Sequence, residues 1–260
     1  MNEHIPFVAM ECVLFEIKEE KIMRLDKLLA NMGYGSRKEV KVLLKQMAVT
    51  VDGDVVKDSA MHVDPVKQNV SVLGERVKYV EFIYIMMHKP PGVISATEDR
   101  QDQTVIDLLD PYAQNFQPFP VGRLDKDTEG LLLITNDGNL AHNLLSPKKH
   151  VPKWYYAKID GVVTEADIEA FANGVTLDDG YETKPGELVI LSSGIESEIE
   201  LMIQEGKFHQ VKRMFEAVGK KVTYLKRISM GPLQLDAELE LGDYRELTEE
   251  ELSTLIQHNA

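Results

Sequence analysis

A short charged segment that runs directly into an apolar one is the strongest constraint on how this chain folds. Residues 122–138 read G-R-L-D-K-D-T-E-G-L-L-L-I-T-N-D-G. The apolar part, residues 131–134, is too short for a stable helix and is bounded by Gly130 and by an Asn-Asp-Gly turn, so it predicts a buried central strand. The polar loop before it is therefore expected on rigid structure at the edge of a core, where a reactive carboxylate gains from fixed geometry and low dielectric.

The carboxylates of this loop allow several interpretations from the residues alone. Asp125, Asp127 and Glu129 can simply be solvated, as exposed acids usually are. They also occupy the first, third and fifth places of a calcium loop, but Asn136 stands where a bidentate glutamate is needed, so the sequence does not favour calcium. The interpretation of Asp125 and Asp127 as the two catalytic carboxylates of a glycosidase also remains, because their spacing along the loop does not give the distance between their carboxyl groups.

Taken as a whole, the segment resembles the signature of the bacterial pseudouridine synthases that act on ribosomal RNA, in particular the group that modifies small-subunit (16S) rRNA. The resemblance implies that Asp125 is the essential aspartate and that Arg123 is its basic neighbour. The K-P-P-G sequence at residues 89–92 matches the element that opens the catalytic domain in this family.

Two further segments carry the same resemblance and imply partners for the aspartate. A K-x-Y pattern falls on Lys153 and Tyr155, so Tyr155 is expected to stack on the target base, with Tyr156 as the alternative. The sequence G-K-F-H-Q-V-K-R-M at residues 206–214 implies that Lys212 pairs with the aspartate, with Arg213 as the alternative. An opposite charge close to a carboxylate favours its ionised form.

The N-terminal part resembles the S4 RNA-binding domain. The likeness is carried by R-L-D-K-L-L-A at residues 24–30, S-R-K-E-V at 36–40 and V-T-V-D-G at 49–53. Ser36 and Glu39 form a capping box that predicts the start of a second helix, and an Asp-Gly dipeptide suited to a type I′ turn predicts a hairpin over 49–56.

The distribution of charge along the chain fits RNA binding better than the net charge does. The net charge is -14, yet residues 24–45 carry six basic against two acidic side chains and residues 207–227 carry seven against one. Two basic patches on an acidic body are typical of a protein that grips nucleic acid in a few places. The residues expected to contact RNA are Arg24, Lys27, Arg37, Lys38, Lys41 and Lys45 in the first patch, His209, Gln210 and Arg213 in the second, and Arg123.

The sequence and the resemblance together predict an α+β protein with three parts. Residues 1–22 are expected to be a dispensable extension, residues 23–80 an S4 domain, and residues 82–260 a pseudouridine synthase domain with a mixed, mainly antiparallel sheet flanked by helices. Within the last part we expect strands at 82–87 and 153–159 and two more within 187–204. We expect helices at 104–109, 139–145 and 164–173, one that ends at Gly219, and one from 248 onward.

Several classes of function are disfavoured by what the sequence lacks. The single cysteine, Cys12, allows no internal disulfide, and no Cys/His cluster, glycine-rich phosphate loop or dinucleotide fingerprint is visible. We expect no metal and no cofactor, because converting uridine to pseudouridine is an isomerisation. No export signal or membrane segment is recognised, so the protein is expected in the cytoplasm. It is expected to be a monomer and to act on ribosomal RNA or on an assembly intermediate. The alternatives are a sister enzyme for large-subunit (23S) rRNA, a non-catalytic S4-type assembly factor and a glycosidase.

Overall fold

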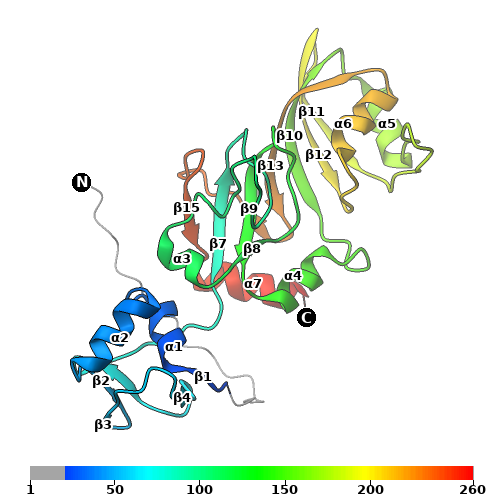
Figure 1. Ribbon diagram of the computed structural model, residues 1–260. Coiled ribbons are helices and arrows are strands. Elements are labelled where there is room, and N and C mark those ends of the chain that lie inside the picture. Colours follow the sequence, from blue (N-terminus) through cyan, green and yellow to red (C-terminus); the bar gives the residue numbers. More distant parts are fainter. Residues whose placement is uncertain (1–20, 260) are drawn as a thin grey trace. The chain divides into compact units, whose positions relative to one another are not determined.

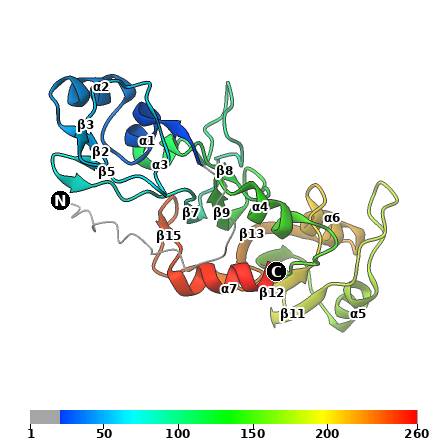
Figure 2. The same ribbon diagram turned by 90° about the horizontal axis from the view of Figure 1, so that it is seen from below.

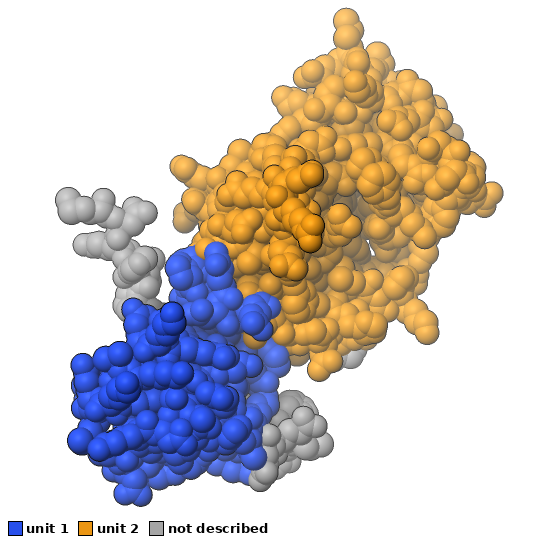
Figure 3. All heavy atoms as spheres, viewed as in Figure 1, with its two compact units in different colours: residues 1–82, 110–117 blue, residues 83–109, 118–260 orange. Residues whose placement is uncertain are grey.

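The chain forms two compact units, each with its own core. The structure is a computed structural model that describes residues 21–259 (Figure 1), so Cys12 and nearly all of the predicted extension at 1–22 lie outside the described residues. The first unit comprises the chain up to Phe82 together with Asp110–Gln117 (Figure 3). The second comprises Ile83–Leu109 and the chain from Pro118 onward.

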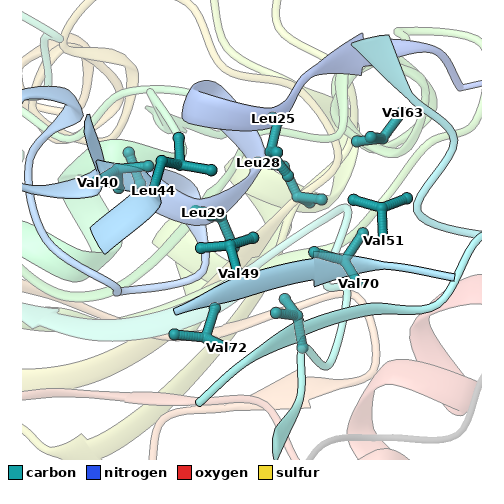
Figure 4. Close-up of a cluster of buried hydrophobic side chains, with 12 residues drawn as sticks. Leu25, Leu28, Leu29, Val40, Leu44, Val49, Val51, Val63, Val70 and Val72 are labelled. Carbon is teal, nitrogen blue, oxygen red and sulfur yellow. The ribbon is translucent and has the colours of Figure 1, made fainter. Parts of the chain in front are cut away.

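The N-terminal part of the first unit is built from two short helices over small antiparallel strands. Apolar side chains of both helices, among them Leu25, Leu29 and Val40, meet the valines of the strands in one buried cluster (Figure 4). The main sheet has the order β3-β2-β5-β6, and β1 pairs with β4. The elements are β1 (Met23–Arg24), α1 (Leu25–Asn31), α2 (Arg37–Lys45), β2 (Val49–Val51), β3 (Asp54–Val55), β4 (His62–Val63), β5 (Val70–Val72) and β6 (Glu75–Arg76).

Local signals in this unit act as the sequence predicts. The Ser36 and Glu39 side chains cap each other's backbone N–H at the start of α2, at 3.4 and 2.7 Å. Asp52 and Gly53 both have positive φ, 54° and 93°, as a type I′ turn requires between β2 and β3. The predicted helix and hairpin are therefore confirmed.

The helix predicted at 104–109 is wrong, and a helix follows it instead. Thr104 and Asp107 make the reciprocal hydrogen bonds of a capping box, but Asp110 is extended before Pro111, so the turn is not continued as a helix. Asp110 then caps α3 (Pro111–Asn115), with proline at the first helical position, where its missing N–H costs nothing. Although the sequence placed it in the second domain, α3 packs in the first unit, where the Asn115 amide donates to the Ala30 carbonyl at 3.2 Å.

The second unit is a mixed sheet of nine strands flanked by helices (Figures 1 and 2). Seven strands run in the order β11-β12-β10-β13-β9-β7-β15, and β8 and β14 attach to β9 and β13. Among the named strands of the described residues, only the β13–β9 pair is parallel, so the predicted fold class is confirmed. The strands are β7 (Tyr84–Lys89), β8 (Phe119–Pro120), β9 (Glu129–Thr135), β10 (Lys153–Asp160), β11 (Glu187–Ser192), β12 (Glu196–Ile203), β13 (Lys221–Met230), β14 (Leu233–Gln234) and β15 (Tyr244–Glu246).

The segment at 131–134 forms the middle of β9, and all four side chains are buried. Leu131 and Leu133 pack with Leu140 of α4 and Leu255 of α7 in one core cluster. Phe171 of α5 and Phe215 of α6 meet edge to face, with ring centroids 4.9 Å apart. The helices are α4 (Gly138–Leu145), α5 (Glu165–Asn173), α6 (Gln210–Ala217) and α7 (Glu249–Asn259), close to their predicted positions. No helix among the described residues has the length and apolarity needed to cross a membrane.

Candidate active site

The loop that carries Asp125 is fixed at both ends before β9 begins. Upstream, the buried Ser95 hydroxyl donates to the Leu124 carbonyl at 3.1 Å and accepts from the Leu124 N–H at 3.0 Å. Downstream, the Thr128 N–H donates to the Asp125 carbonyl at 3.1 Å, which closes a tight turn. Asp125 therefore has its backbone set by hydrogen bonds on either side.

Lys89, the last residue of β7, supports this turn from inside the protein. Its side chain is 0% exposed, and the ammonium donates to the carbonyls of Pro90, Lys126 and Thr128 at 2.9, 3.3 and 2.9 Å. Burial lowers the pKa of Lys89 to about 8, against the opposing charges of Asp127, Asp125 and Glu129. The sequence pointed to the K-P-P-G element, but not to the role of its lysine as a scaffold for the aspartate loop.

Gly130 lets the strand after the loop approach its parallel neighbour. Its φ is +108°, and a Cβ atom at this position would lie 2.2 Å from the Arg227 carbonyl oxygen of β13. The Arg227 Nε in turn donates to the Leu131 carbonyl at 2.8 Å. Only glycine satisfies both the backbone conformation and the close contact, so the distance of the Asp125 loop from β13 depends on this residue.

Two side chains of the third motif reach the Asp125 carboxylate. Lys212 of α6 lies 3.4 Å from Asp125 Oδ2, and His209 Nε2 lies 3.6 Å from Asp125 Oδ1. Lys212 also donates to both oxygens of Asp127, at 2.6 and 2.9 Å. The lysine expected to serve Asp125 is thus shared with a second carboxylate, to which its contacts are shorter.

Asp127 is the more exposed carboxylate of the two, with 73% of its side chain accessible against 25% for Asp125. Burial works to raise the pKa of Asp127, but the hydrogen bond and the charge of Lys212 outweigh it, so the pKa is lowered. Asp127 therefore holds the ammonium in place beside the less accessible Asp125.

Tyr155 and Tyr156 lie on opposite faces of β10, as strand alternation predicts. Tyr155 is 7% exposed and lies opposite Leu201 of β12 and Arg227 of β13. The Tyr156 hydroxyl donates to Glu198 at 2.7 Å on the other face. Burial and this hydrogen bond raise the pKa of Tyr156 to about 12. Of the two tyrosines, Tyr155 is the one that lines a pocket together with Asp125.

A pocket opens beside the aspartate. It brings together Asp125, Tyr155, Arg123 and His209 from segments that lie far apart in the sequence. Apolar side chains, including Ile203 and Leu225, complete its wall. An aromatic ring, a carboxylate and several cations in one concave site suit a flat, polar, anionic substrate such as a nucleotide.

The remaining residues expected to contact RNA fall into different settings. Arg123 is exposed at the pocket and has no ion-pair partner among the described residues. Gln210 is 3% exposed, donates to Glu205 at 2.6 Å and accepts from the Lys207 N–H at 2.9 Å. Arg213 makes ion pairs with Asp178 and Asp179 at 2.5 and 2.7 Å. Gln210 is thus hydrogen-bonded and Arg213 ion-paired within the chain, and their contacts with RNA stay a prediction.

The basic residues of the first unit are exposed. Lys27 projects from α1, while Arg37, Lys38, Lys41 and Lys45 project from α2. The Arg24 guanidinium donates to both oxygens of Asp26, at 3.0 and 2.7 Å. The side of α2 that bears Lys38, Lys41 and Lys45 is therefore available to a partner. We call these three residues the α2 basic face.

No group of three or more histidine, cysteine, aspartate or glutamate side chains in the described part of the chain could hold a metal ion.

Two family models match the chain. Residues 83–217 match the RNA pseudouridylate synthase model, and residues 23–68 match the S4 domain model. The chain belongs to the RNA pseudouridylate synthase family.

Relatives of this synthase cover almost its whole length. It is 58% identical to an RNA pseudouridine synthase, YtzG, of Bacillus subtilis (strain 168), over 92% of this chain and 100% of the relative. It is 43% identical to the ribosomal small subunit pseudouridine synthase A of Vibrio cholerae, over 90% and 99%, and 39% identical to the ribosomal large subunit pseudouridine synthase B of Bacillus subtilis, over 89% and 95%. A crystal structure of a pseudouridylate synthase, 35% identical, matches with a TM-score of 0.63 over 90% of this chain and 99% of that one.

Membership of this family decides between the interpretations that the residues alone left open. The synthase is an enzyme that isomerises uridine to pseudouridine in RNA, and it carries an S4 domain at its N-terminal side. The glycosidase and the non-catalytic assembly factor are therefore set aside.

Proposed function

We propose that this synthase modifies a uridine of small-subunit (16S) ribosomal RNA and that Asp125 is its catalytic carboxylate. The observation that carries the proposal is the meeting of Asp125 and Tyr155 at one pocket, with Lys212 3.4 Å from the Asp125 carboxylate, in a chain 43% identical to a small-subunit synthase. We infer a monomer that acts in the cytoplasm on ribosomal RNA or on an assembly intermediate.

The reaction sets a clear task for each group. The bond between C1′ of the ribose and N1 of the uracil breaks, the base turns over, and a bond forms between C1′ and C5. The proton lost from C5 balances the one gained at N1. Asp125 acts on the ribose or the base, Tyr155 stacks on the uracil, and Lys212, held by Asp127 at 2.6 Å, keeps a positive charge beside the catalytic carboxylate.

Access to the base requires that it leave the RNA stack, at a cost of a few kcal/mol. Arg123, exposed at the pocket, supplies a cation that can bind an adjacent phosphate or fill the vacated space.

Residues 23–80 form the S4 domain in this proposal, and residues 82–260 form the catalytic domain. The exposed cations of α2 bind the RNA backbone, which contributes affinity and not base identity.

A second candidate substrate is large-subunit (23S) rRNA. It is supported by the 39% identity to a large-subunit synthase over nearly the full length of both chains. The same pocket chemistry serves either target, so the two candidates differ in the RNA that is bound and not in the reaction.

Mapping pseudouridine across all ribosomal RNA from cells with and without this protein tests the proposal. We expect one 16S position to lose its modification when the gene is deleted. Wild-type protein should restore it and the Asp125→Asn variant should not. A change confined to 23S rRNA would replace the proposed target by the second candidate, and unchanged ribosomal RNA would contradict both.

A further inference from the structure

Phe208 is an exposed aromatic side chain beside the proposed active site. It is 75% exposed, although a phenylalanine normally buries most of its ring. Its ring stacks on that of His209, with centroids 3.7 Å apart and planes 20° from parallel. Consecutive side chains can stack in this way here because His209 has a left-handed backbone conformation, with φ of 51°. One face of Phe208 is thus supported and the ring remains largely open.

The turn that presents Phe208 is held by hydrogen bonds that leave the ring free. The buried Gln210 accepts from the Lys207 N–H at 2.9 Å, and the Gln210 N–H donates to the Lys207 carbonyl at 3.2 Å. Arg213 donates to the Phe208 carbonyl at 3.4 Å and is itself held by Asp178 and Asp179. A rigid aromatic side chain loses little conformational entropy when it binds a partner.

The stack extends outward from the carboxylate. The His209 ring lines the pocket, with Nε2 3.6 Å from Asp125 Oδ1, and Phe208 packs on that ring. Two cations, Lys207 and Arg123, line the same pocket. An open aromatic face with cations close by is the arrangement with which proteins bind single-stranded nucleic acid, since bases stack on the ring and phosphates pair with the cations.

We propose that Phe208 is a stacking platform for an RNA base that flanks the target uridine. The inference rests on the proposed function and deepens it: Tyr155 would contact the uridine that reacts, and Phe208 a neighbouring base that stays in the strand. When the uridine leaves its stack, its neighbour loses a stacking partner, and Phe208 replaces that partner. The platform therefore favours the opened form of the RNA that the pocket can accept.

Three substitutions separate stacking from mere apolar contact. Phe208→Ala removes the side chain, Phe208→Leu keeps apolar bulk without a flat face, and Phe208→Trp keeps the flat face. On an unmodified 16S rRNA transcript, we expect kcat/KM to fall roughly 5- to 100-fold for the alanine and leucine variants, the range of one lost base–aromatic stack. The tryptophan variant should retain wild-type kcat/KM. Ile195→Ala, a change at an 87% exposed apolar residue of the β11–β12 turn, is the matched control and should have no effect.

A fluorescence measurement tests the contact without turnover. In the Asp125→Asn background, the tryptophan of the Phe208→Trp variant should be quenched when the transcript binds, beyond the change given by Trp154, the natural tryptophan. Equal kcat/KM for wild type and Phe208→Ala, equal activity of the leucine and tryptophan variants, or absence of quenching would each overturn the platform. If wild-type protein forms no pseudouridine in the transcript and the quenching persists, the proposed target fails and the platform stands.

Discussion

The Asp125 loop and the α2 basic face are built on opposite physical principles. The loop is held by buried groups whose hydrogen bonds are satisfied inside the protein, such as Lys89, which is 0% exposed and donates to three carbonyls. The basic face consists of exposed lysines without ion-pair partners among the described residues. Buried contacts specify the geometry that a reaction needs, and exposed charges supply affinity that neither requires nor enforces precise geometry.

This difference predicts how each region responds to mutation. One change in the support of the loop should damage both stability and turnover, because the buried partners cannot adapt. Changes on the basic face should add up gradually and affect only RNA affinity and its salt dependence.

The largest loss of stability is expected for Gly130→Ala. The new Cβ would lie 2.2 Å from the Arg227 carbonyl oxygen at a φ of +108°, so β9 and β13 must move apart. We expect the free energy of unfolding to fall by about 3 kcal/mol or more, with loss of most activity. Gly138→Ala in α4, where no atom lies within 4 Å of the new Cβ, is the control for the same chemical change. A stable and active Gly130→Ala variant would show that the loop does not depend on this close approach.

Lys89→Met should have the next largest effect. It removes the Lys89 donor from the carbonyls of Pro90 and Thr128, and one of two donors from that of Lys126, so denaturant unfolding should show a loss of roughly 2–4 kcal/mol. Turnover should fall by at least about 100-fold, because a shift of about 1 Å in a catalytic group is costly. Lys126→Met removes a half-exposed lysine that pairs with Asp102, and its stability should change by less than about 0.5 kcal/mol. Comparable effects of the two lysines would contradict the assigned support.

Replacing Lys38, Lys41 and Lys45 together by glutamine should leave stability and kcat at saturating RNA unchanged. The slope of log affinity against log salt concentration should become shallower by about 2–3, because three phosphate contacts are lost. Lys57→Gln, at another exposed lysine of the same unit, serves as the control. An unchanged salt slope in the triple variant would remove the α2 basic face from the RNA-binding surface.

The smallest effect concerns pH. Burial lowers the pKa of both Lys89 and Lys153 to about 8, and the nearby charge of Arg227 adds to the effect at Lys153. Between pH 8 and about 9.5 the unfolded chain keeps these protons while the folded chain loses them, so a rise in pH favours folding. We expect the free energy of unfolding to increase by about 1–2 kcal/mol over this window, measured by denaturant titration. The increase should be smaller for Lys153→Met, and a decrease in the wild-type protein would refute the buried lysines as its source.

The features that sequence reasoning predicted depend on contacts between residues close in the chain. The capping box at Ser36, the Asp-Gly turn at residue 52 and the buried strand at 131–134 follow from chemistry within a few positions. The helix expected at 104–109 failed for a local reason as well, because the residue before Pro111 is extended and the turn that Thr104 and Asp107 cap is not continued.

The features that sequence reasoning did not predict depend on how segments far apart in the sequence align with one another in the fold. Asp127 and Lys212 are 85 positions apart, and nothing in either motif shows that the ammonium would lie closer to Asp127 than to Asp125. Lys89 reaches the loop only because β7 and β9 are neighbours in the sheet. The resemblance to a family indicated which segments meet, and the coordinates supplied the contacts within them.

In the proposed reaction Asp125, and not its neighbour Asp127, performs the chemistry. Both carboxylates contact Lys212, so Asp125→Asn and Asp127→Asn form a matched pair for pseudouridine formation on unmodified 16S rRNA transcript under single-turnover conditions. We predict that Asp125→Asn gives no detectable product while its RNA affinity stays within a few fold of wild type. Asp127→Asn should slow the reaction by about tenfold through the less restrained Lys212. Substantial product from Asp125→Asn, or complete loss confined to Asp127→Asn, would contradict the account.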